Sequence, residues 1–174
     1  MANVARDAEI AEIDAFLAET KRLRGGPPPW HPSGWNTEFQ AVWNVEDVNG
    51  VVRAQLRLIC LRAINTYPKI NLIIRGRSIW RVEIEDPPRP HRNPHWAAQL
   101  GLPAIVVGSH EHTWPDNRDH VAAIAPDWDL PCHRALQPNV RRLPQALASF
   151  AQAIHLEIDS GQRSFDVPPQ RELL

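Results

Sequence analysis

The feature that most constrains the fold is an alternation of apolar and polar residues between positions 38 and 85. A period of two is typical of a strand that buries one face. The first predicted strand places four apolar side chains on its core face: Phe39, Ala41, Trp43 and Val45. Asn49-Gly50 is a strong turn signal. The second strand returns from this turn with five core-facing residues: Val52, Ala54, Leu56, Leu58 and Cys60.

The same pattern predicts two more strands, one over about 69–74 and one over 78–85, joined by the turn Arg75-Gly76-Arg77. The fourth strand has an inward and an outward set: Trp80, Val82 and Ile84 inward, and Ile79, Arg81 and Glu83 outward. Four consecutive strands with short turns predict an antiparallel meander that is covered on one face.

Helices are predicted at both ends of the chain. Residues 5–24 carry apolar side chains at helical spacing, with acidic residues early and basic residues late, before Gly25-Gly26 ends the helix. Apolar residues from Leu143 to Ile158 repeat with the same period, and Gly161 suits the end of that helix. We therefore predict an α+β fold, in which an antiparallel sheet of four to five strands packs with an N-terminal and a C-terminal helix.

A chain of 174 residues is expected to form one domain. Within it we distinguish four parts. They are an N-terminal helix and proline-rich connector over 1–34, the sheet and a histidine-rich core over 36–120, a loop and C-terminal helix over 121–162, and a tail over 163–174.

The composition is that of an ordinary globular protein, with 43% hydrophobic and 22% charged residues. A formal net charge of −1 excludes a strongly basic protein that coats nucleic acid, but it allows a local basic groove. Two cysteines, Cys60 and Cys132, are too few for a disulfide framework. Because the chain also lacks an apolar stretch of about 20 residues and a signal-peptide profile, we expect a cytoplasmic protein without membrane contact.

The stretch from position 90 to position 118 has the highest concentration of side chains that can transfer a proton, bind a metal ion or hold a phosphate. Six of the eight histidines fall between positions 91 and 133. We predict a fifth strand over 104–113, in which His110 and His112 point to the same face, roughly 7 Å apart.

These histidines suggest acid–base chemistry. Two imidazoles can serve as general base and general acid in the cleavage of RNA, whose 2′-hydroxyl is the nucleophile. The candidate catalytic residues are His91, His110 and His112, and Arg92 is the candidate for holding the phosphate. Further candidates for binding substrate are Asn93, Thr113, Asn117 and Arg118. In this hypothesis the protein is a metal-independent ribonuclease and needs no cofactor.

Arginines form a second pattern: Arg53, Arg57, Arg75, Arg77, Arg81, Arg89 and Arg92. Arg53, Arg57 and Arg81 fall on the presumed solvent side of the sheet, and the turn adds Arg75 and Arg77. Acidic residues are interleaved with them, which favours a solvated face of mixed charge. The alternative is a phosphate-binding surface that leads toward the histidines and is extended by Arg141-Arg142.

Two other functions remain open. In one, the protein binds a divalent metal ion or is a metal-dependent hydrolase centred on His110 and His112, with further ligands drawn from His91, His95, Glu111, His120, Cys132 and His133. In the other, the histidines are structural, and loops rich in tryptophan and proline form the interface of a non-catalytic binding module. A common catalytic site requires His91 and His110 to lie within about 10 Å of each other in one cleft.

Two short motifs resemble those of a group of small uncharacterised bacterial proteins. In that group an Arg-Gly turn precedes a Pro-His-Arg-Asn-Pro loop and a strand with His-x-His. The matching residues are Arg75-Gly76-Arg77, Pro90 to Pro94 and His110-Glu111-His112, and the resemblance spans about residues 68–120. Here His95-Trp96 and an extra segment replace the tight turn that follows the loop in the group.

The group is similar in character to toxin–antitoxin proteins, some of which cleave RNA. The resemblance therefore implies an RNA-directed protein of toxin or defence type, whose partner is RNA or a protein such as a cognate antitoxin. For the binding-module alternative it implies an antitoxin, immunity or phage-interaction protein.

Overall fold

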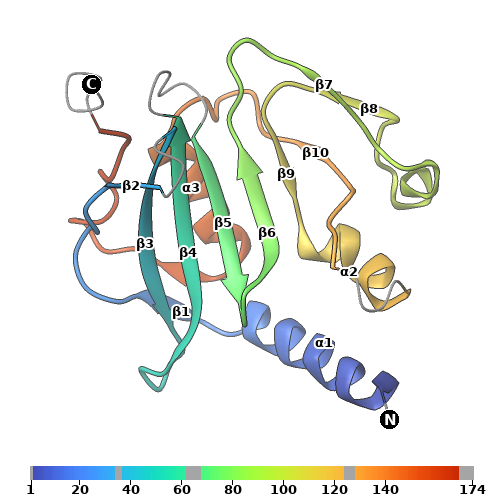
Figure 1. Cartoon of the computed structure of the whole chain (residues 1–174), viewed down its shortest axis with the longest axis horizontal. Coiled ribbons are helices and arrows are strands. Elements are labelled where there is room, and N and C mark those ends of the chain that lie inside the picture. Colours follow the sequence, from blue (N-terminus) through green and yellow to red (C-terminus); the bar gives the residue numbers. More distant parts are fainter. Residues whose placement is uncertain (1, 34–36, 62–67, 124–127, 169–174) are drawn as a thin grey trace.

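The computed structural model describes residues 2–33, 37–61, 68–123 and 128–168. Within these ranges, nine strands form one largely antiparallel sheet (Figure 1). Its spatial order is β10 (Arg134–Ala135), β9 (His110–His112), β6 (Arg77–Glu83), β5 (Lys69–Ile74), β4 (Val52–Leu61), β3 (Glu38–Glu46), β1 (Lys21–Leu23) and β11 (Leu156–Glu157), with β2 (His31–Pro32) paired to β3. The remaining elements are the ribbon of β7 (Pro90–Arg92) and β8 (Ile105–Val107), the helices α1 (Ala2–Ala18), α2 (Trp114–Ala123) and α3 (Leu143–Ala153), and the 3-10 helix η1 (His95–Leu100).

The α+β class and the antiparallel sheet are confirmed, but the sheet has more strands than the four to five predicted. The four predicted strands are β3 to β6, each antiparallel to the next. The additional strands of this sheet are two or three residues long. Segments this short contain no measurable alternation, so that only their pairing in the folded chain reveals them.

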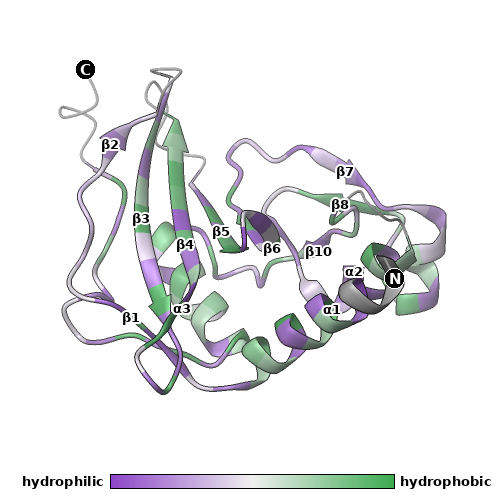
Figure 2. Cartoon of the chain, turned by 60° about the horizontal axis from the view of Figure 1, so that its bottom comes forward, coloured by the Kyte–Doolittle hydropathy of each residue, from purple (hydrophilic) through white to green (hydrophobic). Residues whose placement is uncertain are grey.

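The two terminal helices bury the apolar side of the sheet. Ile13 and Phe16 of α1 and Phe150 of α3 belong to the same buried cluster as the core-facing strand residues. The ring of Phe150 lies edge-on to that of Trp80, with centroids 6.2 Å apart. The apolar character of α3 where it crosses the sheet is visible in Figure 2.

Several arginines of the predicted solvent face pair with α1. This helix lies beside the end of the sheet where β5 turns into β6 (Figure 1). Arg75 pairs with Glu12 at 2.7 Å, and Arg77 pairs with Glu9 at 3.2 Å. Arg53 also contacts Glu12, at 2.9 Å. This part of the arginine pattern is therefore a mixed-charge contact between helix and sheet.

Both terminal helices are shorter than predicted, and each is followed by a strand. Helix α1 ends at Ala18 instead of near residue 24, and α3 ends at Ala153. The strands that follow, β1 and β11, pair in parallel with Lys21 opposite Leu156. Neither of these helices, nor any other in the described part of the chain, is long and apolar enough to cross a membrane.

Ile79, which the alternation placed outward, is fully buried beside Trp80. The pairing of β5 with β6 shifts register between Leu72 and Ile73, opposite this point. Such an irregularity allows two successive side chains to point inward.

The predicted fifth strand over 104–113 is two strands in different sheets. β8 pairs with β7, whereas β9 pairs with β6 and β10. Gly108 separates them with a φ of 82°, and a Cβ atom there would lie 2.9 Å from Cβ of Pro88. Glycine is therefore required at this turn. Helix α2 follows β9 and extends into the part predicted as a loop from residue 121, which also contains β10. Residues 124–127 lie outside the described residues.

The first residues of the predicted C-terminal tail pack against the sheet. The ring of Phe165 is buried, stacked on Trp30 at 5.4 Å and edge-on to Trp43 at 5.0 Å. Residues 169–174 of that tail, and residue 34 at the end of the predicted connector, lie outside the described residues.

Candidate functional site

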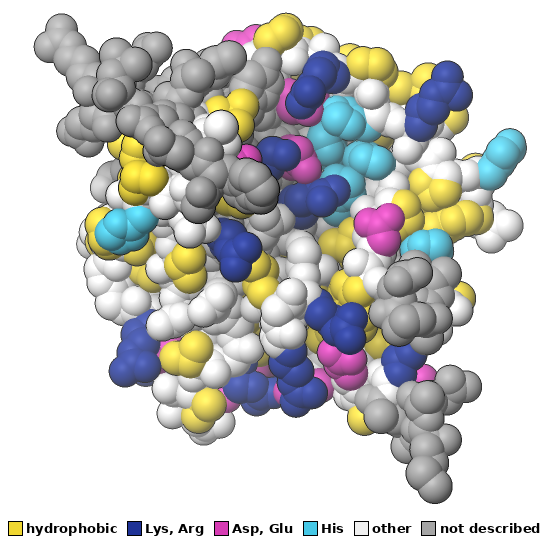
Figure 3. Space-filling view, in the orientation of Figure 1, with side chains coloured by type: hydrophobic (Ala, Val, Ile, Leu, Met, Phe, Trp, Pro, Cys, Tyr) yellow, Lys and Arg dark blue, Asp and Glu magenta, His cyan; other side chains and the backbone are white. Residues whose placement is uncertain are grey.

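Four histidines that are distant in the sequence meet at one end of the sheet. They are His91 of β7, His110 and His112 of β9, and His133, which immediately precedes β10. Ring centroids lie 4.0 Å apart for His91 and His110 and 4.3 Å apart for His112 and His133. Figure 3 shows histidine side chains as one patch on the surface, bordered by basic and acidic groups. The proximity that a common site requires is present.

Strand pairing places the two histidines of β9 over β6. His112 lies opposite Arg81, and His110 lies opposite Glu83. Because alternate residues of paired strands share a face, these four side chains lie on the same side of the sheet. On this side of the sheet, Arg81 and Glu83 of β6 therefore lie directly beside His112 and His110.

Asn93 joins the β7–β8 ribbon to the segment that carries His133. Its side-chain Nδ2 donates to the carbonyl oxygens of Pro103 and His133, at 2.7 and 2.9 Å. Its Oδ1 accepts the backbone N–H of His133 at 2.6 Å. Asn93, predicted to bind substrate, thus holds His133 beside His91.

Each of the four histidines uses one ring nitrogen to bond a protein oxygen. The bonds are His110 Nδ1 to Gly108 O at 2.9 Å, His112 Nδ1 to Leu130 O at 2.6 Å, His91 Nε2 to Glu85 Oε2 at 2.9 Å, and His133 Nδ1 to Asn93 Oδ1 at 3.3 Å. Carbonyl and carboxylate oxygens only accept, so we assign the hydrogen to these nitrogens. In the neutral ring the opposite nitrogen then carries a lone pair.

Only one of these four lone pairs has a donor. Nη2 of Arg81 lies 2.7 Å from Nε2 of His112, so both nitrogens of that ring are engaged. For His91, His110 and His133, the second ring nitrogen has no hydrogen-bond partner within the described ranges. The cluster therefore contains one saturated imidazole and three that can still accept a proton or a metal ion.

The surroundings favour neutral imidazoles. Burial, with the guanidinium of Arg81 beside it, lowers the pKa of His112 to about 3. Burial and the neighbouring rings of His110 and His91 lower the pKa of His133 to about 4. Burial also lowers the pKa of His110. Neutral imidazole is the form that binds metal ions and that acts as a general base.

A buried carboxylate adjoins the cluster. The side chain of Glu85 is 2% exposed and bonds both His91 and Arg89 at 2.9 Å. Burial opposes its ionisation, but hydrogen bonds from His91 and Arg89 hold the pKa of Glu85 below its usual value. Glu85 therefore supplies a fixed negative charge that orients the ring of His91.

Within the described residues, two groups of side chains have ligand atoms close enough to share a metal ion. One is His91, His110 and His133, and the other is Glu83, His110 and His112; in each, the atoms lie within 4.8 Å of one another. In the second group, Glu83 already pairs with Lys69 at 2.8 Å and with Arg81 at 2.9 Å, and His112 is saturated. The first group has its lone pairs available and is the better metal site.

Three predicted substrate-binding residues serve the local structure. Asn117 is buried: its Nδ2 donates to Thr113 O, and its Oδ1 accepts the N–H of Cys132. Thr113 Oγ1 accepts the N–H of Asp116 at 3.2 Å. Arg118 binds Asp14 of α1, at 2.8 Å. Of the predicted phosphate-binding residues, Arg92 lines a cavity together with His112 and His133.

His133, Arg81 and Glu85 were absent from the predicted site residues. His133 appeared only as one of several optional metal ligands, and Arg81 as part of the solvent face. Their sequence signals are weak because none belongs to a spaced motif. Arg81 is the direct cross-strand partner of His112 in the β6–β9 pairing, and a local sequence pattern does not reveal such a pairing.

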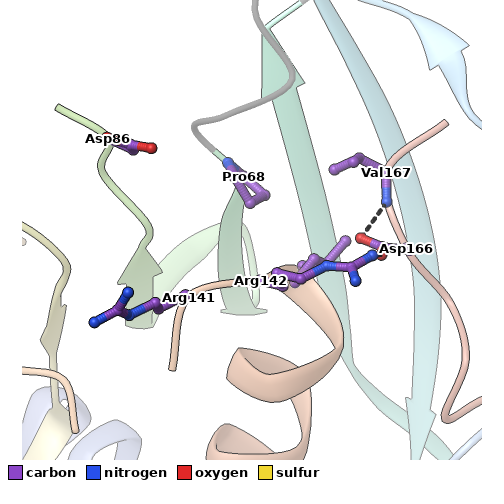
Figure 4. A pocket seen from close by; sticks show the side chains of 7 residues that line it. Pro68, Asp86, Arg141, Arg142, Asp166 and Val167 are labelled. Carbon is purple, nitrogen blue, oxygen red and sulfur yellow. Dashed lines mark hydrogen bonds and ion pairs between the residues drawn. The ribbon is translucent and has the colours of Figure 1, made fainter. Parts of the chain in front are cut away.

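A second cavity, of about 280 Å³, lies beside the start of α3 and shares no lining residue with the histidine site (Figure 4). Arg142 in this cavity is bound to Asp166. Arg141 uses its Nε to donate to Pro138 O at 3.2 Å. These two arginines, predicted as an extension of a phosphate-binding surface, line a separate cavity.

Comparisons with known proteins found no match: no family model, no curated protein and no solved structure is similar to this chain.

Proposed function

We propose that this protein is a metal-dependent hydrolase whose metal ion binds to His91, His110 and His133. The observation that carries the proposal is the set of three lone pairs that the protein leaves without a donor, each on a ring whose other nitrogen is already bonded. Metal-binding histidines in proteins characteristically use their second nitrogen in this way.

The spacing is compatible with a first-row transition metal such as zinc. Around a tetrahedral ion with Zn–N distances of about 2.0–2.1 Å, ligand atoms lie about 3.4 Å apart. One nitrogen of each of the three rings lies within 4.8 Å of the other two, so a bound ion requires the rings to move closer together. Three protein ligands leave one position open, which is the arrangement of catalytic zinc. Such an ion activates a bound water for hydrolysis.

The test is metal binding by the purified, chelator-treated protein. We expect one zinc ion per chain by calorimetry and elemental analysis, and loss of this binding in His110→Ala. The matched control is His112→Ala, on the same strand and face, which should retain binding because His112 has no free lone pair. Circular dichroism verifies folding of each variant. Absence of stoichiometric binding, or equal loss in both variants, would refute the metal site.

A metal-independent ribonuclease is the second candidate. It is favoured by the two guanidinium groups of Arg81 and Arg92, which line the same cavity as His112 and His133. RNA cleavage that persists in EDTA and disappears in His110→Ala would support this function instead. If the protein neither binds a metal ion nor cleaves RNA, the non-catalytic binding module remains as the prediction.

A further inference from the structure

We propose that the substrate is a phosphodiester, held by Arg81 and Arg92 in the cavity beside the histidines. This inference rests on the proposed hydrolase function and names the chemical class on which it acts.

The cavity has a volume of about 430 Å³, within the range of small-molecule sites in proteins. Its polar lining consists of Arg81, Arg92, Asn93, His112, Asp129 and His133. His133 belongs both to this lining and to the three-histidine group. A ligand in the cavity therefore lies next to the proposed metal ligands.

Arg92 is available to a ligand. It follows His91 directly on β7 and is exposed, and its guanidinium has no hydrogen-bond or ion-pair partner among the residues that the structure describes. Arg118 and Arg134, in contrast, are bound to Asp14 and Asp116. An unpaired guanidinium at a cavity is a ready donor for the paired oxygens of a phosphate.

Arg81 is held in place instead. Its Nε lies 2.9 Å from Glu83 Oε1, and its Nη2 lies 2.7 Å from His112 Nε2. Among described residues, Nη1 has no partner. Because a guanidinium is planar and rigid, these two contacts fix the direction of the remaining donors. The cavity thus combines one fixed and one adjustable cation.

The charge balance of the cavity lining, without the metal ion, favours a monoanion over a dianion. Two guanidinium groups and the carboxylate of Asp129 face the cavity, and Glu83 is also neutralised by Lys69. The lining therefore has one net positive charge. A phosphodiester carries a single negative charge, whereas a phosphomonoester carries about 1.5 to 2 near neutral pH. The carboxylate of Asp129 opposes the additional charge of the monoester.

The reaction is hydrolysis. The oxygen of water forms a bond to phosphorus, the P–O bond to one alcohol breaks, and the departing alkoxide takes the proton that the water loses. The products are a phosphomonoester and an alcohol, and no oxidant or reductant is required.

The experiment measures how fast the zinc-loaded protein hydrolyses three chromogenic esters: bis(4-nitrophenyl) phosphate, 4-nitrophenyl phosphate and 4-nitrophenyl acetate. We expect the diester to be hydrolysed with a kcat/KM at least tenfold above that of the monoester. Arg92→Gln should raise KM for the diester about tenfold and leave zinc affinity unchanged. Arg141→Gln, an exposed arginine at the separate cavity, is the matched control and should change neither quantity.

The outcomes separate this inference from the proposed function. Zinc binding without hydrolysis of the diester, or preference for the acetate or the monoester, overturns the phosphodiester inference and leaves the metal site intact. An unchanged KM in Arg92→Gln also overturns it. If zinc does not bind, the proposed function fails. Arg92-dependent binding of bis(4-nitrophenyl) phosphate to the metal-free protein, measured by calorimetry, would then still support the assigned ligand class.

Discussion

Lys21 and the histidine cluster are both buried polar centres, but they differ in what the protein leaves unsatisfied. Lys21 is 1% exposed, and its Nζ donates to the carbonyl oxygens of Leu17, Glu19 and Ile154, at the ends of α1 and α3. An ammonium group has three N–H donors, and all three are used. Three of the four histidines, in contrast, keep a lone pair.

Burial of a polar side chain therefore does not by itself indicate function. A saturated group such as Lys21 joins elements, whereas a group held from one side only is prepared for a ligand. Within the cluster, His112 resembles Lys21, because Arg81 and the carbonyl oxygen of Leu130 occupy both of its ring nitrogens.

Lys21→Ala should lower the free energy of unfolding by about 3 kcal/mol, because it leaves a cavity and removes the donor from three carbonyl groups, of which that of Ile154 is buried. Urea denaturation measures the change. Zinc affinity should stay within about threefold of the parent value. Lys69→Ala, which removes a partly exposed ion pair with Glu83, should cost less than about 1 kcal/mol. Equal losses in the two variants would mean that the buried lysine has no special structural role.

His133→Ala should affect zinc affinity strongly and the free energy of unfolding only slightly, the reverse of Lys21→Ala. We expect zinc affinity to fall about 100-fold or more, since it removes one of three ligands and since second-shell changes alone cost 10- to 100-fold. The free energy of unfolding of the metal-free protein should change by less than about 1 kcal/mol. Calorimetric titration and urea denaturation provide the two measurements. A large stability loss with unchanged zinc affinity would place His133 in the same class as Lys21.

The buried ammonium should make stability depend on alkaline pH. Burial lowers the pKa of Lys21 to about 8, below its ordinary value, so the unfolded chain binds more protons between about pH 8 and 10.5. The free energy of unfolding therefore rises with pH across that window, by about 2 kcal/mol. Below pH 8 the folded protein bears the full cost of burying the charged ammonium. The measurement is the difference in unfolding free energy between parent and Lys21→Met, which cancels other titrating groups. A difference that falls or stays level from pH 8 to 10 would contradict the expected sign.

Glu85→Gln should give the smallest effect, a loss of about tenfold in zinc affinity, because the amide still accepts from His91 but lacks the negative charge. Glu46→Gln is the control. Glu46 is also a buried carboxylate paired with arginines, Arg22 and Arg24, but it lies in β3. Calorimetry on both variants measures the zinc affinity. Equal affinities in the two variants would mean that Glu85 does not contribute to metal binding.

The regular half of the fold was predictable from local pattern. Alternation over β3 to β6 requires one buried face, and this set most core positions before any contact was known. Ile79 is an exception because a register shift between strands moves it inward. The short edge strands and the boundary between α1 and β1 were missed, because two or three residues carry no periodic signal and Leu23 suits either conformation.

The meander, the helices near both ends of the chain and the concentration of imidazoles between positions 91 and 133 follow from local sequence patterns. Which imidazoles meet depends on contacts between distant segments of the folded chain. His91 reaches His110 through the β7–β8 ribbon, and Asn93 brings in His133 from 40 residues away. The physical reason is that strand pairing and hydrogen bonds between distant segments decide which ring nitrogens are occupied. Occupancy of those nitrogens distinguishes a structural histidine from a ligand.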